Sequence, residues 1–153
     1  MTNAAADDSN YEPSSWEWVA DQVAEYEASG GTRANTLLDT GLPIIVVTTV
    51  GHKTSKTRKF PLMRVEYDGE YGLIASKAGS PTHPGWYFNL AADPQIKIQD
   101  GAEALSYEVR ELSGEERSVW YDRGIEAYGD YQAYADATEG HREIPVFVAT
   151  KTD

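Results

Sequence analysis

The distribution of apolar and polar residues along the chain predicts several β-strands joined by short turns. The longest apolar run, at residues 42–50, is rich in β-branched residues, which favours a buried strand. Alternating patterns and a late apolar run predict further strands at residues 59–67, 71–76, 95–99, 104–112 and 144–149. Asp68-Gly69 and Asp100-Gly101 favour tight hairpin turns between neighbouring strands.

A helix is predicted before the first strand. Ser14 or Ser15 can cap a helix that ends near Ala28, where Ser-Gly-Gly follows. Apolar residues at helical spacing are expected to face the core, namely Trp16, Val19, Ala20 and Val23. Trp18 lies off that stripe. It is either a partly exposed aromatic residue or a side chain that closes over a ligand site or a partner.

Three further helices are predicted later in the chain. One covers residues 84–92. Ser113 and Glu116 match a capping box, with Ser113 as the N-cap of a helix that runs to about Tyr128. A short helix follows Gly129. Because strands and helices do not alternate one to one, we expect an α+β or mainly β protein. Its predicted fold is a small antiparallel barrel with helices packed outside, including the N-terminal helix.

The length and composition favour one domain. The chain has 153 residues, of which 13–153 form the predicted domain, while residues 1–12 are small, polar and acidic and are expected to be disordered. The absence of Cys excludes disulfides and cysteine chemistry. We see no signal-peptide pattern and no apolar run long enough to span a bilayer, so a cytoplasmic location is expected.

The charge of the chain is strongly acidic but unevenly distributed. A net charge of -12 argues against nucleic-acid binding and against docking on an anionic membrane surface, although other peripheral membrane contact stays open. Residues 41–65 and 71–92 nevertheless contain no Asp or Glu. The first window also holds a group of cations: Lys53, Lys56, Arg58, Lys59 and Arg64. This pattern predicts an anion-binding site.

Several common site motifs are absent. Residues 51–57 only superficially match a phosphate-binding P-loop, because Lys56 stands where the second Gly belongs and a strand follows. The sequence contains neither the GxGxxG dinucleotide fingerprint nor the GxSxG nucleophile elbow. Its histidines are scattered without metal-site spacing (His52, His83 and His141), so no metal is expected.

Two segments remain as parts of a candidate binding site. The Gly-, Ser- and Thr-rich turn with Lys53 and Arg58 can form a cradle for a phosphate or a carboxylate. The alternative is a solvated basic turn without a specific ligand. In the second window, Lys77 follows a predicted strand, and Trp86 and Tyr87 offer flat rings. Together these residues favour a ligand with an anionic tail and a planar ring.

From about residue 35 to 148, the chain resembles the deazaflavin-dependent nitroreductase and quinone reductase family, split β-barrel proteins that use coenzyme F420. Three motifs carry the resemblance: Gly51-His52-Lys53-Thr54-Ser55-Lys56-Thr57-Arg58-Lys59-Phe60-Pro61-Leu62, Ala75-Ser76-Lys77-Ala78-Gly79, and Pro84-Gly85-Trp86-Tyr87-Phe88-Asn89-Leu90 followed by Pro94. A late tyrosine series also matches: Tyr128, Tyr131 and Tyr134. The chain departs from the family pattern at His52, Ser55, Ala78 and Gly85.

The resemblance implies roles for individual residues. The residues expected to hold the coenzyme are His52, Lys53, Thr54, Arg58, Pro61, Ala75, Lys77, Ala78, Gly79, Pro84, Trp86, Tyr87 and Asn89. The residues expected to line the substrate pocket are Met63, Ser76, Tyr128, Tyr131 and Tyr134. Ser76 and Tyr131 are the catalytic candidates, because either can stabilise negative charge on an acceptor oxygen. For the tyrosines, the alternative is helix packing at i, i+3 and i+6.

The activity implied by the resemblance is hydride transfer from reduced coenzyme F420 to a quinone-like acceptor, with nitroaromatics accepted incidentally. Two other functions stay open from the sequence. One is an FMN-binding oxidoreductase of the same barrel type, and the other is a protein that binds the deazaflavin without turnover. The chain is expected to be a monomer or a homodimer.

Overall fold

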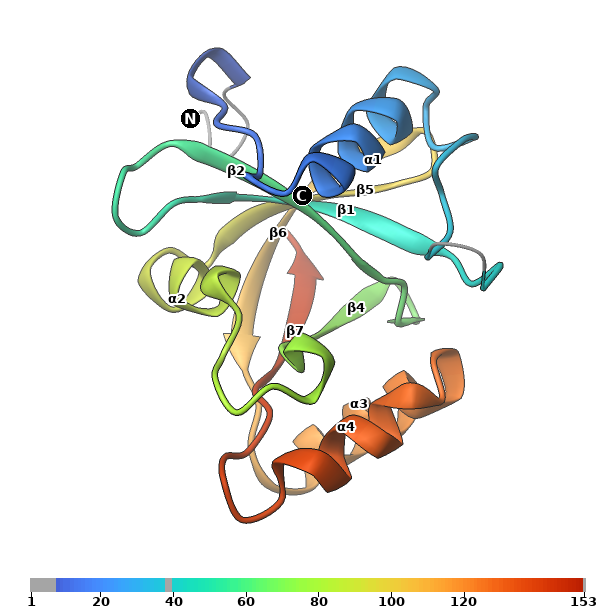
Figure 1. Cartoon of the computed structure of the whole chain (residues 1–153), viewed down its shortest axis with the longest axis vertical. Helices are drawn as coiled ribbons and strands as arrows, with labels where there is room; N and C mark the ends of the chain where they lie inside the picture. Colours follow the sequence, from blue (N-terminus) through green and yellow to red (C-terminus); the bar gives the residue numbers. More distant parts are fainter. Residues whose placement is uncertain (1–7, 38–39, 153) are drawn as a thin grey trace.

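The computed structural model describes residues 8–37 and 40–152, in which seven strands form one antiparallel sheet. The strands are β1 (Ile44–Val50), β2 (Thr57–Met63), β3 (Glu66–Tyr67), β4 (Glu70–Ile74), β5 (Gln95–Asp100), β6 (Glu103–Glu111) and β7 (Val146–Lys151). Their order is β2-β1-β5-β6-β7-β4-β3. The sheet curls into an open half-barrel (Figure 1), so the predicted split β-barrel is confirmed.

Helices pack outside this sheet, as the sequence predicts. They are α1 (Glu17–Ala28), α2 (Gly85–Ala92), α3 (Gly114–Ala127) and α4 (Asp130–Thr138). Helix α1 lies over the β1, β2 and β5 end of the sheet, while α3 and α4 lie together at the opposite end of the molecule (Figure 1). No helix in the described ranges is long and apolar enough to cross a membrane.

Strand β1 is buried on both faces, which explains why its sequence is made of β-branched residues and has no charged one. Ile44 and Val46 belong to one apolar cluster, which also contains residues of α1, α3 and α4. Ile45 and Val47 belong to a second cluster on the other face. Successive strand residues point to opposite faces, so a strand between two cores favours apolar residues on both of its faces. Each fully buried aliphatic side chain contributes roughly 1.5–3 kcal/mol.

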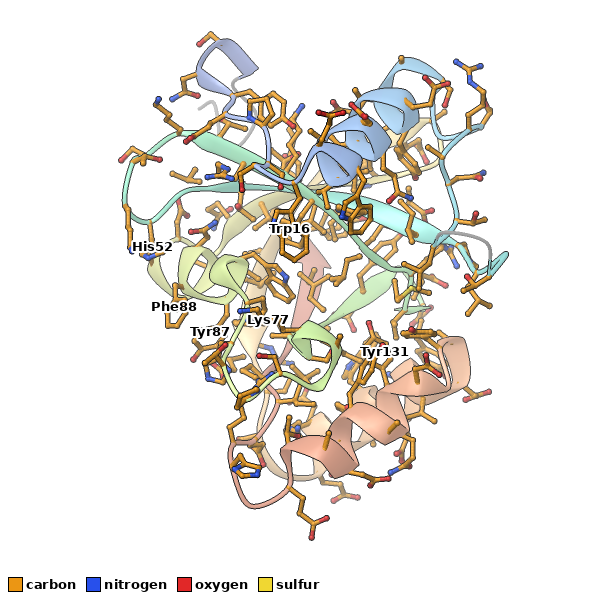
Figure 2. All side chains as sticks on the ribbon, viewed as in Figure 1. Trp16, His52, Lys77, Tyr87, Phe88 and Tyr131 are labelled. Carbon is orange, nitrogen blue, oxygen red and sulfur yellow. The ribbon has the colours of Figure 1, made fainter. Side chains whose placement is uncertain are left out.

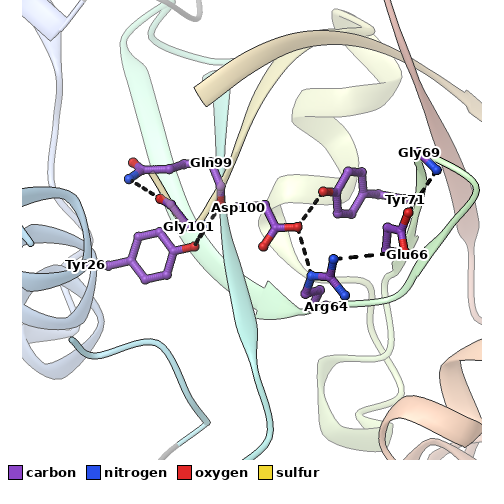
Figure 3. A network of polar contacts seen from close by, with 8 residues as sticks. All are labelled: Tyr26, Arg64, Glu66, Gly69, Tyr71, Gln99, Asp100 and Gly101. Atoms are coloured by element: carbon purple, nitrogen blue, oxygen red, sulfur yellow. Dashed lines mark hydrogen bonds and ion pairs between the residues drawn. The ribbon is translucent and has the colours of Figure 1, made fainter. Parts of the chain in front are cut away.

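A network of polar contacts attaches α1 to the sheet (Figure 3). The hydroxyl of the buried Tyr26 donates to the Gln99 carbonyl at 3.2 Å and accepts from the Gly101 N–H at 2.7 Å. The neighbouring Asp100 carboxylate accepts from Arg64 Nε at 2.8 Å and from the Tyr71 hydroxyl at 2.5 Å. These bonds join α1, the end of β2 and β4 to the β5–β6 turn.

Two details at the helix starts differ from the sequence predictions. Helix α1 begins at Glu17, so Trp16 is the N-cap and its side chain is 63% exposed rather than part of the core. Ser113 is the N-cap of α3, but it makes no side-chain capping bond. Glu116 instead forms a two-bond ion pair with Arg110 on β6. A charged partner within reach therefore replaces the predicted capping box.

The predicted disordered tail, residues 1–12, is described only from residue 8 onward. Asp8–Asn10 form a short 3-10 helix. The Glu12 N–H donates to the Thr57 carbonyl at 2.9 Å, and Asn10 Oδ1 accepts from Thr57 Oγ1 at 3.0 Å. Residues 8–12 therefore contact β2 through Thr57, which gives them hydrogen-bond partners. Residues 1–7 lie outside the described residues.

Replacement of Tyr26 by Phe should lower the free energy of unfolding by about 1–3 kcal/mol, because it leaves Gln99 O and Gly101 N–H without their partner. Urea denaturation followed by circular dichroism measures this change. Tyr67→Phe is the matched control, since the Tyr67 side chain is exposed, and should change stability by less than about 0.5 kcal/mol. Equal stability of the two variants would contradict this role of Tyr26.

Candidate functional site

A cavity of about 540 Å³ lies between the start of α1, the β1–β2 loop and α2. Nine of the residues expected to hold the coenzyme line it: His52, Lys53, Thr54, Arg58, Pro61, Lys77, Pro84, Trp86 and Asn89. They come from three segments of the chain that the fold brings together. Trp16 and Trp18 complete the lining from the side of α1. Trp18 is 49% exposed and borders the candidate ligand site, so both of its predicted roles stay open.

Cations gather at the β1–β2 side of the cavity. Lys53 is exposed on the loop, and Arg58 on β2 pairs with Glu12 at 3.6 Å. An ion pair that is this exposed contributes little to stability, so Arg58 can exchange Glu12 for an anionic ligand. Lys59 is different, because it is buried and its Nζ lies 2.6 Å from the Glu27 carboxylate on α1. Lys59 thus helps to hold α1 against β2.

The apolar part of the cavity is lined by stacked aromatic rings. Phe60 on β2 and Trp86 on α2 have ring centroids 5.0 Å apart and planes that differ by 12°. Trp16 and Trp18 form a second aromatic pair, with centroids 6.4 Å apart. Gly85 also lines the cavity, and a Cβ added there would meet nothing within 4 Å. The cavity therefore offers flat apolar surfaces and free space next to its cations, which suits a planar ligand with an anionic tail.

Asn89 fixes the β1–β2 loop to α2. Its Oδ1 accepts from the His52 backbone N–H at 2.9 Å and lies 2.7 Å from His52 Nδ1. Because this oxygen can only accept, His52 Nδ1 carries the hydrogen. Asn89 Nδ2 donates in turn to Thr49 Oγ1 at 3.3 Å within the buried part of β1. Asn89 lines the cavity, but its side-chain contacts within the protein hold the loop in place.

Lys77 enters the cavity from the turn after β4 (Figure 2). Ala75 and Ser76, which precede it, are buried. Lys77 and Ala78 have left-handed φ values of 47° and 53°. Such a conformation costs of order 1–3 kcal/mol for each residue that is not glycine. In the described part of the chain, Ala75, Ala78 and Gly79 are not among the residues that line the cavity. Their expected contacts with the coenzyme stay predictions.

Tyr131 lies away from the cavity, at the α3–α4 end of the molecule (Figure 2), and the rings of Tyr128 and Tyr134 pack against it. Tyr131 is 3% exposed and packs in the same apolar cluster as Met63. Tyr128 and Tyr134 are partly buried against that cluster, and their hydroxyls are 3.0 Å apart. Within the described residues, these four and Ser76 are not among the lining residues of the cavity. Their substrate-binding and catalytic roles stay predictions.

The environment of Tyr128 and Tyr131 keeps the hydroxyls of these two residues protonated. Burial raises the pKa of Tyr131 above its ordinary value. Burial also raises the pKa of Tyr128, and its contacts with Tyr134 and Asp130 add to that shift. At neutral pH each hydroxyl is therefore a hydrogen-bond donor and not a base. This state suits stabilisation of negative charge on an oxygen, the role predicted for Tyr131.

Tyr87 is the other coenzyme candidate that does not line the cavity in the described residues. Its hydroxyl donates to Glu111 on β6 at 3.2 Å, and its ring lies 4.5 Å from that of His83. Arg142 was missed from the sequence, although its guanidinium donates to the carbonyls of Ala75 and Ser76. A single arginine in a loop carries no motif, so no sequence signal marks this contact.

A second hollow, of about 590 Å³, lies beside the connection from α4 to β7. Its lining includes Asp136, Glu139 and Glu143, which would repel an anion. Its two arginines, Arg117 and Arg142, already donate to backbone carbonyls. Within residues 8–37 and 40–152, no group of three or more His, Asp or Glu residues could hold a metal ion. The first cavity is therefore the candidate functional site.

Replacement of Asn89 by Ala should lower the free energy of unfolding by about 1–2 kcal/mol and accelerate hydrogen exchange at the His52 amide, because that N–H loses its acceptor. Urea denaturation and amide hydrogen exchange measure the two effects. Asn89→Asp keeps an acceptor oxygen and should retain slow exchange at neutral pH. Unchanged exchange at His52 in Asn89→Ala would show that the loop is held by other contacts.

Comparisons with known proteins identify the family of this chain. The family model described as F420H(2)-dependent quinone reductase matches residues 18–151. An F420H(2)-dependent quinone reductase of Mycobacterium tuberculosis is 30% identical over 115 residues, which cover 71% of this chain and 74% of the relative.

Two solved structures are similar over most of their length. An F420-H2 dependent reductase (FDR-A) is 48% identical, with a TM-score of 0.66, and the match covers 71% of this chain and 94% of the other. A second structure, described as a domain-swapped dimer, is 43% identical, with a TM-score of 0.68. The match covers 90% of this chain and 100% of the other. The chain therefore belongs to the F420H(2)-dependent quinone reductase family.

Proposed function

We propose that this protein is an oxidoreductase that transfers a hydride from reduced coenzyme F420 to a quinone. The observation that carries the proposal is the cavity of about 540 Å³ in which residues of three family-like motifs meet. One side offers cations for an anionic tail, and the other offers stacked aromatic rings for a planar head. The family model supports the identity of the coenzyme.

The residues present fit the coenzyme. Lys53 and Arg58 would hold the phosphate and glutamate tail, with backbone N–H groups of the β1–β2 loop. Trp86 would contact the ring, and Lys77 would supply a further cation to the bound coenzyme. When bound, the reduced deazaflavin supplies the hydride, and the protein supplies position and electrostatics.

The protein's own contribution is to exclude water and to stabilise charge. Trp16 and Trp18, at the mouth formed by α1, would cover the reacting ring. Ser76 and Tyr131 remain the proposed donors to the acceptor oxygen on which negative charge develops. Water or a tyrosine hydroxyl would deliver the proton that completes the reduction. Nitroaromatics are proposed as incidental acceptors, because they are flat and electron-poor like a quinone.

The activity is tested with purified protein, reduced coenzyme F420 and a naphthoquinone. We expect the absorbance of the oxidised coenzyme to appear only when the protein and the quinone are both present. Absence of turnover with several quinones, despite tight coenzyme binding, would favour a protein that binds the deazaflavin without catalysis. Absence of both binding and turnover would contradict the proposed function.

FMN is the alternative coenzyme, and it would place one phosphate in a cavity with several cations. The family model favours coenzyme F420. Competition between the two ligands decides directly, because FMN should displace coenzyme F420 only at large excess. Tighter binding of FMN would overturn the choice of coenzyme while leaving the site itself in place.

Replacement of both Lys53 and Arg58 by Ala should weaken coenzyme F420 binding by about tenfold or more, because the anionic tail loses two charge-assisted contacts. Titration of the coenzyme's fluorescence measures the dissociation constant, and the loss should shrink at high salt. Lys56→Ala with Lys151→Ala is the matched control, since it removes the same charge from exposed residues that do not line the cavity. Equal losses in both proteins would indicate only a general charge effect.

The protein is proposed to be a homodimer. One similar structure is described as a domain-swapped dimer, which supports the homodimer among the two expected states. Sedimentation of the purified protein distinguishes a homodimer from a monomer. The cytoplasmic location stays a prediction from the sequence.

A further inference from the structure

The turn that carries Lys77 into the cavity has a backbone that needs support. Ser76 has ordinary helical angles, with φ -77° and ψ -32°, but Lys77, Ala78 and Gly79 have φ values of 47°, 53° and 81°. Only glycine adopts such left-handed values without strain. Two of these three residues carry a side chain. Such a turn persists where the surrounding contacts determine its conformation.

Arg142 supplies those contacts from outside the cavity. It lies in the connection between α4 and β7, and its Nη2 donates to the Ser76 carbonyl at 2.8 Å. Its Nη1 donates to the Ala75 carbonyl at 3.2 Å, and its Nε donates to the Ser80 carbonyl at 3.0 Å. The three carbonyls lie on both sides of the left-handed residues. One rigid guanidinium therefore sets the distance between the two ends of the turn.

His83 accepts a fourth contact from the same guanidinium. Arg142 Nη1 lies 2.9 Å from His83 Nδ1. Because a guanidinium can only donate, Nδ1 must accept, so the imidazole is neutral and carries its hydrogen on Nε2. The ring of His83 lies 4.5 Å from that of Tyr87 on α2. His83 thus connects Arg142 to the helix that carries Trp86.

We propose that Arg142 is a positioning residue that holds the Lys77 turn in its ligand-binding conformation, and that His83 completes this hold only while it is neutral. The proposal rests on the proposed function, because Lys77 is taken to act on coenzyme F420. In the described part of the chain Arg142 is not among the residues that line the cavity, so its effect on binding passes through the turn and through His83.

The contacts of His83 give the hold a pH dependence. The charged and titratable groups that face it are Arg142, Glu111 on β6 and Tyr87 on α2. Burial and the charge of Arg142 lower the pKa of His83 below its ordinary value of 6.5, while Glu111 acts in the opposite direction. Above this lowered pKa the contact is intact. As the pH falls through the pKa of His83, its Nδ1 gains a proton. His83 can then no longer accept from Arg142, and its positive charge repels the guanidinium.

The first experiment measures coenzyme F420 affinity and thermal unfolding for Arg142→Gln and Arg142→Lys at pH 7.5. The dissociation constant should rise by about tenfold or more in Arg142→Gln, and by less in Arg142→Lys, which keeps the charge but not the fork. Ala78→Gly added to Arg142→Lys should restore part of the affinity, because glycine needs no support at a left-handed position.

Arg117→Gln is the matched control for a general loss of stability. Arg117 donates to the Ile144 carbonyl at 3.1 and 2.6 Å through two nitrogens, and neither contact involves the turn. This variant should unfold at lower temperature but bind the coenzyme as the wild type does. Equal weakening in Arg117→Gln and Arg142→Gln, or wild-type affinity in Arg142→Gln, would overturn the positioning role.

The second experiment compares the wild type with His83→Asn between pH 7.5 and pH 5.5. Asn can accept through Oδ1 but does not titrate. Wild-type affinity should fall on acidification by more than that of His83→Asn, because only the wild type loses its acceptor for Arg142 when residue 83 gains a proton. Identical pH profiles would overturn the role of His83, and this comparison decides even if Arg142→Gln does not fold. Failure of the wild type to bind the coenzyme would instead contradict the proposed function.

Discussion

Burial of both faces of the sheet is the constraint on which the rest of the structure depends. Even Thr48 and Thr49 of β1 are 8% and 0% exposed, so every polar group in this strand needs a partner inside the protein. Thr49 Oγ1 finds one in Asn89, which also holds the β1–β2 loop. Satisfaction of a buried hydroxyl therefore places the loop that carries Lys53. The hydrogen bonding of a buried side chain thus helps to set the geometry of the ligand site.

The strands were predictable because their patterns are local. The β-branched run at residues 42–50 and the alternation at 104–112 reflect how β1 and β6 are buried, and both strands lie within two residues of the expected bounds. The start of α1 was not predictable in the same way. Trp16 has helical spacing with Val19 and Val23, but it precedes the helix and borders the cavity. Helical spacing of apolar residues alone does not distinguish a residue that packs in the core from one that borders a ligand site.

The candidate site was predictable where its residues belong to one continuous motif. His52, Arg58 and Pro61 share a loop and a strand, so proximity along the chain carries over to the structure. The tyrosine series depends on how α3 and α4 pack against the sheet, which no local pattern contains. Arg142 depends on the path of the chain between α4 and β7, and its acceptors are backbone carbonyls of residues more than 60 positions away. Backbone acceptors leave no trace in an amino-acid sequence.

The contact between residues 8–12 and β2 has a consequence for the behaviour of the protein in solution. Strand β2 stands at one end of the strand order, and Tyr11 forms a parallel bridge with its first residue, Thr57. An uncovered outer strand is a template on which a second chain can pair and aggregate. The N-terminal segment covers the beginning of that strand. Residues 8–12 therefore leave less of this strand open to pairing with another chain.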